Sequence, residues 1–538
     1  MSRSTIHRLL GLFLSSTIVY GVLTYGAIRF PDCAVVYLTA ESLATTGSFA
    51  VPHDLPTWPG FGFSPGRDGK RYSVFGPGLA VAAAPFVRLG MLVNQTKWYA
   101  RVPEWVRVSM YVDARFTHYS APGRRPQDLA PHALRWIVCS LNVLVGALGV
   151  AVFFLLLRSL THSDTAALWV SLLFAFGSLW MPYTGTFFSE PLATLLALVS
   201  LYFLVGNEVA LRAGSPTRRC YFNTLAAGLF LGMAVTAHLT AMLFVPFYLA
   251  YAIYPFFQKT RFAGGTLWGT CTWLAGLGLL LAMLGYYNYI RFGSPFETGR
   301  WVDPALARNC GYGTFVAPWQ GLYQLLFGSG KGLFLFCPAI AISVLWCKRS
   351  WQQYRFLTFM IFAAALFRVG FIASRSDWHG GFCLGPRYLL LITPLLLLPL
   401  GPCVAGWLAA GNRRALGCFA AGAIVCAMQA AYFCVGDIDN FYFMLKLDSL
   451  RAQRHIFSDN LIYTSWQISP LLHLLEAQRS PALLQFIPVD NYTLFACLAT
   501  FCAGVLALVY RKLLPAPLPP PARASTRAAV ALKKRSRR

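Results

Sequence analysis

The stretch LRWIVCSLNVLVGALGVAVFFLLL, residues 134–157, contains a single charged side chain, Arg135. A helix of this length crosses the hydrocarbon core of a bilayer, which needs about 20 mainly apolar residues. Of the 538 residues in the chain, 57% are hydrophobic and 12% are charged, about half the charged fraction of an average soluble protein. We therefore predict an all-α polytopic membrane protein, because a helix satisfies its own backbone hydrogen bonds in lipid.

Similar apolar blocks recur along the chain and predict about twelve transmembrane helices. The first block is too long for the apolar part of a signal peptide, and no small-residue cleavage site follows it, so we expect it to be retained. The predicted helices lie at residues 8–28, 134–157, 166–183, 187–206, 222–238, 240–257, 265–287, 332–347, 356–373, 388–409, 414–434 and 491–510.

The basic residues indicate how the chain crosses the membrane. Lys and Arg are concentrated in alternate connections between the blocks and in the tail ALKKRSRR, so the positive-inside rule predicts that both termini are cytoplasmic. A net charge of +26 would also suit a nucleic-acid-binding protein, but here the charge is divided among short loops. We therefore expect membrane lipids as partners and no nucleic acid.

This topology predicts four parts of the chain. A transmembrane core covers 1–434 and includes a long first extracytoplasmic loop, 29–133. An extracytoplasmic segment covers 435–490, a last transmembrane helix covers 491–511, and a basic, Pro-rich cytoplasmic tail covers 512–538. Within the first loop, AVVYLTAESLATTG predicts a short amphipathic helix, and PGLAVAAAPFVRLGMLV predicts an interfacial helix that is too short to span the bilayer.

The fourteen cysteines show no CxxC pair and no metal-ligand spacing. Most lie inside apolar blocks, where cysteine acts as a small apolar residue. Whether the loop residues Cys310 and Cys383 form a disulfide is left undecided by the sequence. We predict no cofactor, although a divalent cation held by Asp32 and Glu190 is an open alternative.

Two acids lie where apolar blocks meet the non-cytoplasmic side. Asp32 follows the first block, and one interpretation is that it caps the next helix. Glu190 precedes Pro191 at the start of an apolar block, where the helix dipole favours an acid. Ionisable groups at this depth tend to face a cavity and to carry function, so both acids are candidate site residues.

Two Gly-rich turns bring cations to the same side. WHGGFCLGPRYLL places His379 and Arg387 near a helix N-terminus, and GSGKGLF places Lys331 at another. Helix N-termini favour anions, and arginine forms bidentate contacts with phosphate, so the turns predict an anionic headgroup as ligand. The alternative is that these side chains extend toward the lipid interface.

Several motifs follow in order over about residues 1–400: PDCAVVYLTAESLATTG, GKRYSVFGPGLAVAAAPF, FFSEPLATLLALVSLY, FGSPFETG, LFGSGKGLFLFCP and GGFCLGPRYLLLITPLLLL. Together they resemble the GT-C glycosyltransferases, in particular the lipid-carrier-dependent class that includes protein O-mannosyltransferases and the aminoarabinose transferase. The sequence departs from those families in two places. Cys33 follows Asp32 where the mannosyltransferases have a second acid, and VFGPG replaces a Lys-Pro-Pro motif.

The resemblance implies a GT-C type membrane fold and a role for each candidate residue. Asp32 matches the catalytic base of the family, and Glu190 matches a second acid that supports acceptor binding. The donor is a sugar on a polyprenyl phosphate. The resemblance implies that its phosphate and sugar are bound by Lys70, Arg71, Tyr72, Glu297, Lys331, His379 and Arg387.

We therefore expect an integral membrane glycosyltransferase of a bacterial inner membrane. It would move a sugar from a polyprenyl-phosphate carrier to a lipid, glycan or protein acceptor on the non-cytoplasmic face. Asp32 would act as base in a single inverting displacement. The alternatives are a multi-pass transporter or flippase of a lipid-linked or anionic substrate, which a similar number of spans would suit, and a non-catalytic scaffold.

Overall fold

The computed structural model describes residues 2–26, 28, 30–52, 61–96, 132–212, 217–257, 263–302, 314–451, 460–477 and 489–513. The predicted tail and Cys310 lie outside these residues.

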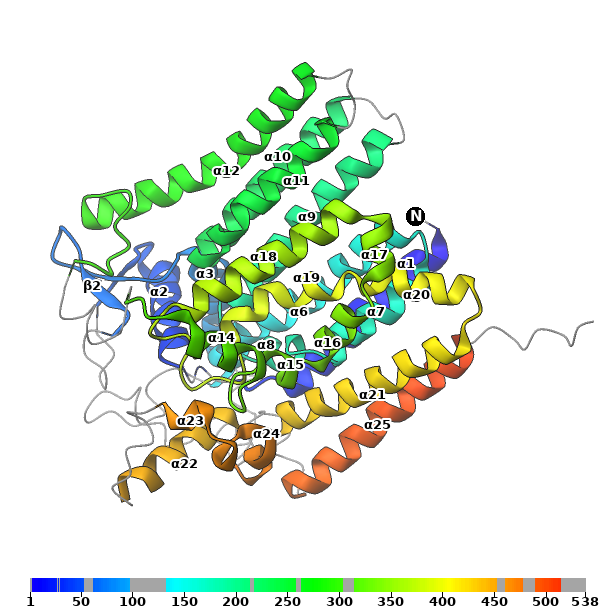
Figure 1. The fold of residues 1–538 in the computed structure, drawn as a ribbon. Coiled ribbons are helices and arrows are strands. Elements are labelled where there is room, and N and C mark those ends of the chain that lie inside the picture. Colours follow the sequence, from blue (N-terminus) through cyan, green and yellow to red (C-terminus); the bar gives the residue numbers. More distant parts are fainter. Residues whose placement is uncertain are drawn as a thin grey trace, which may run out of the picture.

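Long helices form the body of the protein (Figure 1). They are α1 (Arg3–Leu23), α6 (His132–Thr161), α7 (Asp164–Phe176), α9 (Glu190–Arg212), α10 (Thr217–Ala237), α11 (Val245–Phe257), α12 (Ala263–Phe292), α18 (Arg355–Ala373), α20 (Leu400–Ala409), α21 (Arg413–Val435) and α25 (Asn491–Leu513). Shorter helices connect them: α8 (Trp180–Thr184), η3 (Leu239–Phe244), α14 (Pro318–Phe327), α15 (Leu333–Phe336), α16 (Pro338–Leu345), α17 (Lys348–Gln353), η4 (Arg387–Ile392) and α19 (Thr393–Leu397).

The remaining elements lie near one end of the body. They are α2 (Pro31–Thr46), α3 (Gly78–Asn94), α22 (Ile438–Arg451), α23 (Leu461–Thr464), η5 (Trp466–Ile468), α24 (Pro470–His473) and η6 (Leu474–Glu476). The first loop also contains an antiparallel sheet of β1 (Ala50–Val51), β2 (Phe63–Pro65) and β3 (Arg71–Ser73), in the order β1-β3-β2. Helices occur at both predicted positions, as α2 and α3, while their amphipathic and interfacial character stays a prediction. The sheet was not predicted.

The all-α class and the multi-pass membrane character are confirmed. Within the described residues, 8 helices are long and apolar enough to cross a membrane. Each predicted block coincides with helical structure, but several blocks are interrupted. The block at 166–183 divides into α7 and α8 around Gly177, and Pro338 separates α15 from α16. A number of about twelve spans therefore stays a prediction.

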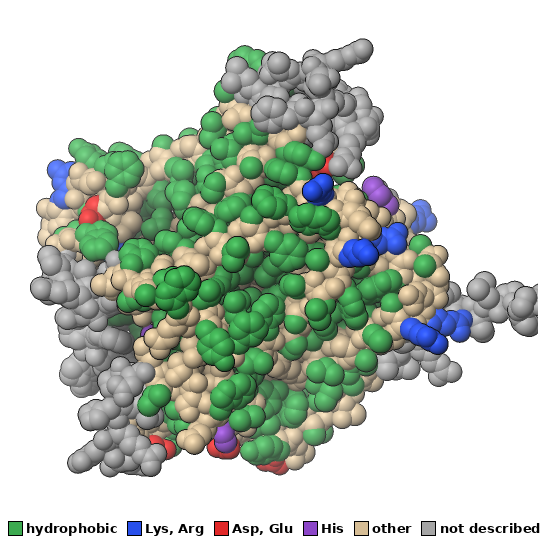
Figure 2. Space-filling view, viewed as in Figure 1, with side chains coloured by type: hydrophobic (Ala, Val, Ile, Leu, Met, Phe, Trp, Pro, Cys, Tyr) green, Lys and Arg blue, Asp and Glu red, His purple; other side chains and the backbone are tan. Residues whose placement is uncertain are grey.

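The two ends of the helical body differ in charge. Figure 2 shows hydrophobic side chains over the middle of one face and Lys and Arg along the edge where α17 lies. Exposed basic residues at that end include Lys348, Arg349, Arg355, Arg413 and Arg414. In contrast, Lys70 and Arg71, which are exposed at the small sheet, lie near the exposed acid Asp68. The small sheet, α2, α22 and α23 lie at the opposite end (Figure 1).

Glycine allows two of the long helices, α10 and α12, to pack closely. A Cβ atom added at Gly228 of α10 would lie 2.1 Å from the carbonyl oxygen of Trp273 in α12. A Cβ atom added at Gly276 would lie 2.4 Å from the carbonyl oxygen of Leu225. Small residues at a crossing let helix backbones approach one another, as is usual in membranes. This packing holds the end of α12 beside the junction of α10 and η3.

Candidate active site around Arg387

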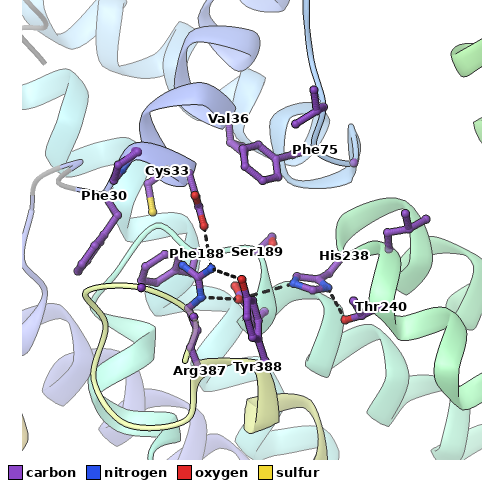
Figure 3. A pocket seen from close by; sticks show the side chains of 18 of the residues that line it. Phe30, Cys33, Val36, Phe75, Phe188, Ser189, His238, Thr240, Arg387 and Tyr388 are labelled. Atoms are coloured by element: carbon purple, nitrogen blue, oxygen red, sulfur yellow. Dashed lines mark hydrogen bonds and ion pairs between the residues drawn. The ribbon is translucent and has the colours of Figure 1, made fainter. Parts of the chain in front are cut away.

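A cavity of about 650 Å³ lies at the end of the body that carries the sheet. It is bounded by the start of α2, the chain after β3, the turn before α9, the junction of α10 and η3, and the end of α12. The loop that leads into η4, together with α22 and α23, completes the wall. Figure 3 shows side chains from several of these segments facing one another. Distant parts of the sequence therefore form one site.

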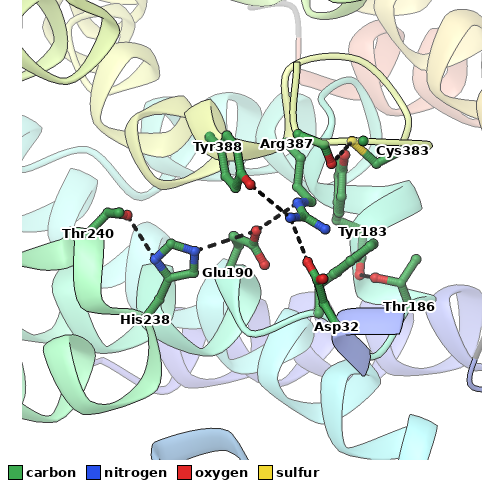
Figure 4. A network of polar contacts seen from close by, with 12 residues as sticks. Asp32, Tyr183, Thr186, Glu190, His238, Thr240, Cys383, Arg387 and Tyr388 are labelled. Atoms are coloured by element: carbon green, nitrogen blue, oxygen red, sulfur yellow. Dashed lines mark hydrogen bonds and ion pairs between the residues drawn. The ribbon is translucent and has the colours of Figure 1, made fainter. Parts of the chain in front are cut away.

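A single guanidinium joins the two predicted acids (Figure 4). Arg387 Nη2 lies 2.8 Å from Asp32 Oδ2, and Arg387 Nε lies 3.1 Å from Glu190 Oε1. The Glu190 side chain is 2% exposed and that of Asp32 is 27% exposed, so only Asp32 is substantially open to the cavity. Buried charges are costly unless paired, which explains why the acids share one cation.

Asp32 occupies the first turn of α2 but does not cap it. Pro31 begins the helix, and the N-cap residue is Phe30, which supplies no side-chain hydrogen bond. The capping interpretation of Asp32 is therefore wrong, because its carboxylate points to Arg387 instead of the backbone of its own helix. Proline at the first position tolerates a missing cap, since it has no N–H group to satisfy.

The turn before α9 determines where Glu190 lies. The buried Asn142 of α6 donates hydrogen bonds to the carbonyl oxygens of Thr186 (2.7 Å) and Phe188 (2.8 Å). These bonds hold the turn against α6, so that α9 begins at Glu190 on the wall of the cavity. On its other side, Glu190 Oε1 lies 3.6 Å from Nε2 of His238.

Glycines shape the loop that carries Arg387. Gly380, Gly381 and Gly385 have φ angles of 70°, 79° and 53°, which disfavour residues with a side chain. A Cβ atom at Gly385 would also lie 2.8 Å from ring atoms of Phe336. The Gly-rich motif is therefore explained by a tight loop packed against α15, which delivers Arg387 to the two acids.

His379 lines the cavity as a neutral side chain. Its Nδ1 accepts a hydrogen bond of 2.9 Å from the backbone N–H of Gly381, and its ring stacks on Tyr463 at 4.2 Å between centroids. Burial and the nearby charge of Lys331 lower the pKa of the imidazole to about 3. His379 can therefore donate a hydrogen bond to a ligand through Nε2, but it does not supply a positive charge at neutral pH.

The lowered pKa of His379 predicts a loss of stability in acid. The unfolded imidazole has a pKa of about 6.5, so between pH 6.5 and 3 the unfolded state binds the proton more tightly. Stability should fall by about 1.4 kcal/mol per pH unit well below pH 6.5 from this group. Thermal unfolding of the solubilised protein at pH 7 and 5 should show a smaller acid shift for His379→Gln than for wild type. Exposed His473→Gln is the control, and an unchanged acid shift in His379→Gln would contradict the assignment.

Lys331 lies behind the cavity wall instead of facing it. Its Nζ donates hydrogen bonds to the carbonyl oxygens of Gly381 (2.9 Å) and Cys383 (2.6 Å), and it lies 5.0 Å from the ring centroid of Tyr463. A Cβ atom at Gly330 would lie 2.5 Å from the carbonyl oxygen of Tyr463. The GSGKG turn therefore joins the Gly-rich loop to the segment that carries α23. A role in phosphate binding stays a prediction.

Lys331→Met should loosen this junction. The change leaves two buried carbonyl oxygens without their donor, which costs about 1–3 kcal/mol for each group. We expect faster hydrogen–deuterium exchange in 461–477 and in 380–385. Lys446→Met, which changes an exposed lysine that lines the cavity, is the matched control. Equal exchange in wild type and Lys331→Met would show that the lysine does not hold the segment.

The other predicted binding residues do not line the cavity. Lys70 pairs with Asp68 at 3.4 Å, and the hydroxyl of Tyr72 donates to the same carboxylate at 2.9 Å. Arg71 is exposed on β3. Glu297 Oε1 accepts from the backbone N–H of Gly299 at 2.7 Å and stabilises a turn. Their neighbours Val74–Pro77, Thr298 and Arg300 do line the cavity, so the predicted motifs lie beside the site.

The site also contains residues that the sequence did not assign. Arg291, at the end of α12, donates to the carbonyl oxygen of Ser73 (2.7 Å) and to Asn288 Oδ1 (2.7 Å). His238 contacts Glu190, and Arg375 forms two hydrogen bonds with Asp377, at 2.7 and 2.6 Å. The sequence pattern around these residues was too weak to predict a role in the site. Arg291 and Arg375 are basic residues on the side predicted to be non-cytoplasmic, whereas His238 is one polar residue between apolar blocks.

The metal alternative has no ligand cluster to support it in the described part of the chain. There, no group of three His, Cys, Asp or Glu side chains could hold a metal ion. The guanidinium of Arg387 lies between Asp32 and Glu190. The divalent cation stays an untested alternative.

Residues 120–301 match the family model described as dolichyl-phosphate-mannose-protein mannosyltransferase. This match confirms, over those residues, the resemblance to protein O-mannosyltransferases stated above. No curated protein sequence matches the chain.

Several solved structures are similar to this chain, including these three. ArnT from Cupriavidus metallidurans bound to undecaprenyl phosphate has 11% identity and a TM-score of 0.47, with 94% of this chain and 78% of that chain covered. The Archaeoglobus fulgidus oligosaccharyltransferase in complex with Zn and sulfate has 14% identity and a TM-score of 0.46, with 79% and 52% covered. The S. cerevisiae protein O-mannosyltransferase Pmt1-Pmt2 complex bound to the sugar donor has 13% identity and a TM-score of 0.38, with 60% and 36% covered.

Proposed function

We propose that this protein is a membrane glycosyltransferase that takes a sugar from a polyprenyl-phosphate carrier. The description of the family model names a donor of this class, a sugar on a polyprenyl phosphate. The observation that carries the proposal is the ion-paired cluster on the cavity wall. There, Arg387 pairs with the buried Glu190 and with Asp32, which is 27% exposed. A partly exposed carboxylate held in a fixed orientation suits a general base.

In the proposed reaction, Asp32 removes the proton from a hydroxyl or amine of the acceptor. The acceptor atom forms a bond to the anomeric carbon while the bond between that carbon and the phosphate oxygen breaks. The phosphate leaves with the bonding electrons, and the anomeric centre inverts. No second carboxylate is needed as a covalent nucleophile, unlike in retaining glycosidases. The acceptor class, whether lipid, glycan or protein, is not specified by these residues.

Arg291 is the cation best suited to the leaving phosphate. Arg387 is matched by two carboxylates and Arg375 by Asp377, so much of their charge is already compensated. In the described structure, Arg291 donates to carbonyl and amide oxygens and to no carboxylate, and it lines the same cavity. A buried guanidinium without an acidic partner stabilises a developing anion well. We therefore add Arg291 to the predicted phosphate ligands.

We further propose that the cavity faces the non-cytoplasmic side of the membrane. A row of exposed Lys and Arg lies at the end that carries α17, and the cavity lies at the other end, where exposed Lys70 is paired with Asp68 (Figures 1 and 2). Positive residues favour the cytoplasmic side, which supports this orientation and the cytoplasmic placement of both termini.

Sugar transfer by the purified protein in proteoliposomes tests this function. The protein would be offered a panel of polyprenyl-phosphate sugars together with lipid, glycan and peptide acceptors. We expect release of polyprenyl phosphate with the sugar appearing on one acceptor class and with inverted anomeric configuration. Movement of an intact donor across the bilayer, without cleavage, would instead support the transporter or flippase alternative. Retention of configuration would contradict the single displacement.

A further inference from the structure

Glu190 lies on the cavity wall but is almost completely buried. Its side chain is 2% exposed, and its carboxylate lies between the guanidinium of Arg387 and the imidazole of His238 (Figure 4). The resemblance to GT-C enzymes implied a role in acceptor binding. The burial and the two partners instead suggest that Glu190 acts through Arg387.

A chain of polar contacts continues behind Glu190. His238 Nδ1 lies 2.8 Å from the hydroxyl oxygen of Thr240. Arg368, which is fully buried in α18, donates from Nη2 to that hydroxyl oxygen and from Nη1 to the carbonyl oxygen of Thr240, both at 2.9 Å. Its Nε donates at 2.8 Å to the carbonyl oxygen of Tyr388, the residue after Arg387. The contacts therefore lead back to η4, the element that begins at Arg387.

The donor and acceptor roles of these four side chains are compatible with one another. Glu190 Oε1 and His238 Nε2 lie 3.6 Å apart, which makes this an electrostatic contact longer than a hydrogen bond, and a His238 ring with its hydrogen on Nε2 accepts at Nδ1. The Thr240 hydroxyl then donates to His238 while it accepts from Arg368, whose guanidinium has donors alone. His238 and Thr240 are partly buried on the cavity wall, and the hydrogen bonds that link them to each other and to the fully buried Arg368 restrain their orientation.

We propose that His238, Thr240 and Arg368 form a support network for Glu190 that positions Arg387, and through it Asp32, for catalysis. This inference deepens the proposed function and rests on it. His238 and Thr240 are positioning residues whose action is transmitted through Glu190. Asp32 lies on α2, Arg387 is the first residue of η4 and Glu190 is the first residue of α9, so the network aligns groups from separate segments. A misplacement of about 1 Å at a reacting group can lower the rate about 100-fold.

Two substitutions of His238 separate its two contacts. In His238→Gln, the amide nitrogen can take the place of Nε2 and donate to Glu190. In His238→Asn, the shorter amide reaches the place of Nδ1 and leaves Glu190 without this donor. We expect His238→Gln to keep kcat within about 3-fold of wild type, and His238→Asn to lower it about 10–100-fold with little change in the donor KM.

Thr240 provides a second test that does not depend on how well the His238 variants fold. Thr240→Val removes the hydroxyl and should lower kcat about 10-fold, whereas Thr240→Ser keeps the hydroxyl and should restore wild-type kcat. Thr240→Val combined with His238→Asn should lower kcat no further than His238→Asn alone, because residues of one network have non-additive effects.

The outcomes distinguish this inference from the proposed function. Transfer by wild type with equal kcat losses in His238→Gln and His238→Asn would overturn the network and leave the function intact. A raised KM at unchanged kcat would show that His238 contacts the substrate, which would also overturn a positioning role. Absence of transfer from any donor by wild type would overturn both proposals.

Discussion

Asp32→Asn should lower the transfer rate about 1,000-fold while the protein still binds polyprenyl phosphate. The substitution keeps the size of the side chain but removes the group that accepts the acceptor's proton, and general base catalysis is typically worth about 100- to 10,000-fold. The neighbouring arginine loses an ion-pair partner but keeps Glu190. Turnover of a radiolabelled donor would give the rate, and binding of polyprenyl phosphate would be measured separately.

Glu41→Gln is the matched control for this experiment, because it removes a carboxylate from the same helix. Glu41 lies nine residues, about two and a half turns, further along α2. It accepts a hydrogen bond of 3.0 Å from Tyr37 and does not line the cavity. Its turnover should be close to that of wild type. Equal turnover in Asp32→Asn and wild type would exclude Asp32 as the base. The ion pair between Asp32 and Arg387 would then have no role in catalysis.

Arg387→Met should both destabilise the protein and abolish transfer. The change leaves Glu190 and Asp32 close together without a cation, and breaking a buried pair in this way costs about 3–5 kcal/mol. Arg387→Lys should rescue only part of the loss, because one ammonium group lacks the planar fork that faces two carboxylates. Chemical unfolding in detergent, followed by near-UV circular dichroism, would report the stability.

A second substitution identifies the cause of that destabilisation. Glu190→Gln in the Arg387→Met background removes the buried charge and should recover a substantial part of the stability without recovering transfer. Lys446→Met, which removes an exposed cation from the same cavity, should leave stability unchanged. If Glu190→Gln further destabilised Arg387→Met, the penalty would come from lost packing and not from unpaired charge.

Apolar periodicity predicted the helical membrane body well, because a span needs little more than length and hydropathy. It could not predict where helices break. The block at 166–183 becomes α7 and α8, and the block at 332–347 becomes α15 and α16, although their hydropathy is continuous. The small sheet around Arg71–Ser73 was missed because its strands are only two or three residues long.

The site was predicted in part. Asp32, Glu190 and Arg387 came from separate motifs, and they meet on the cavity wall. Lys331 was expected to face a ligand, yet its amine is directed to backbone carbonyl oxygens, a choice that depends on packing rather than composition. His238 could not be singled out, since one histidine between apolar blocks has no pattern until its partner is known.

The pairing of Asp32 and Glu190 with Arg387 has a consequence for biosynthesis. A ribosome delivers both acids to the membrane long before it completes the segment that contains Arg387. Until then, each carboxylate must remain hydrated or protonated, because an unpaired charge is costly in a low-dielectric interior. The cluster of Asp32, Glu190 and Arg387 therefore assembles only after α2, α9 and α18 have been synthesised. Translation that stops before Arg387 would leave a nascent membrane protein with two unmatched acids, a feature that cellular quality control could recognise.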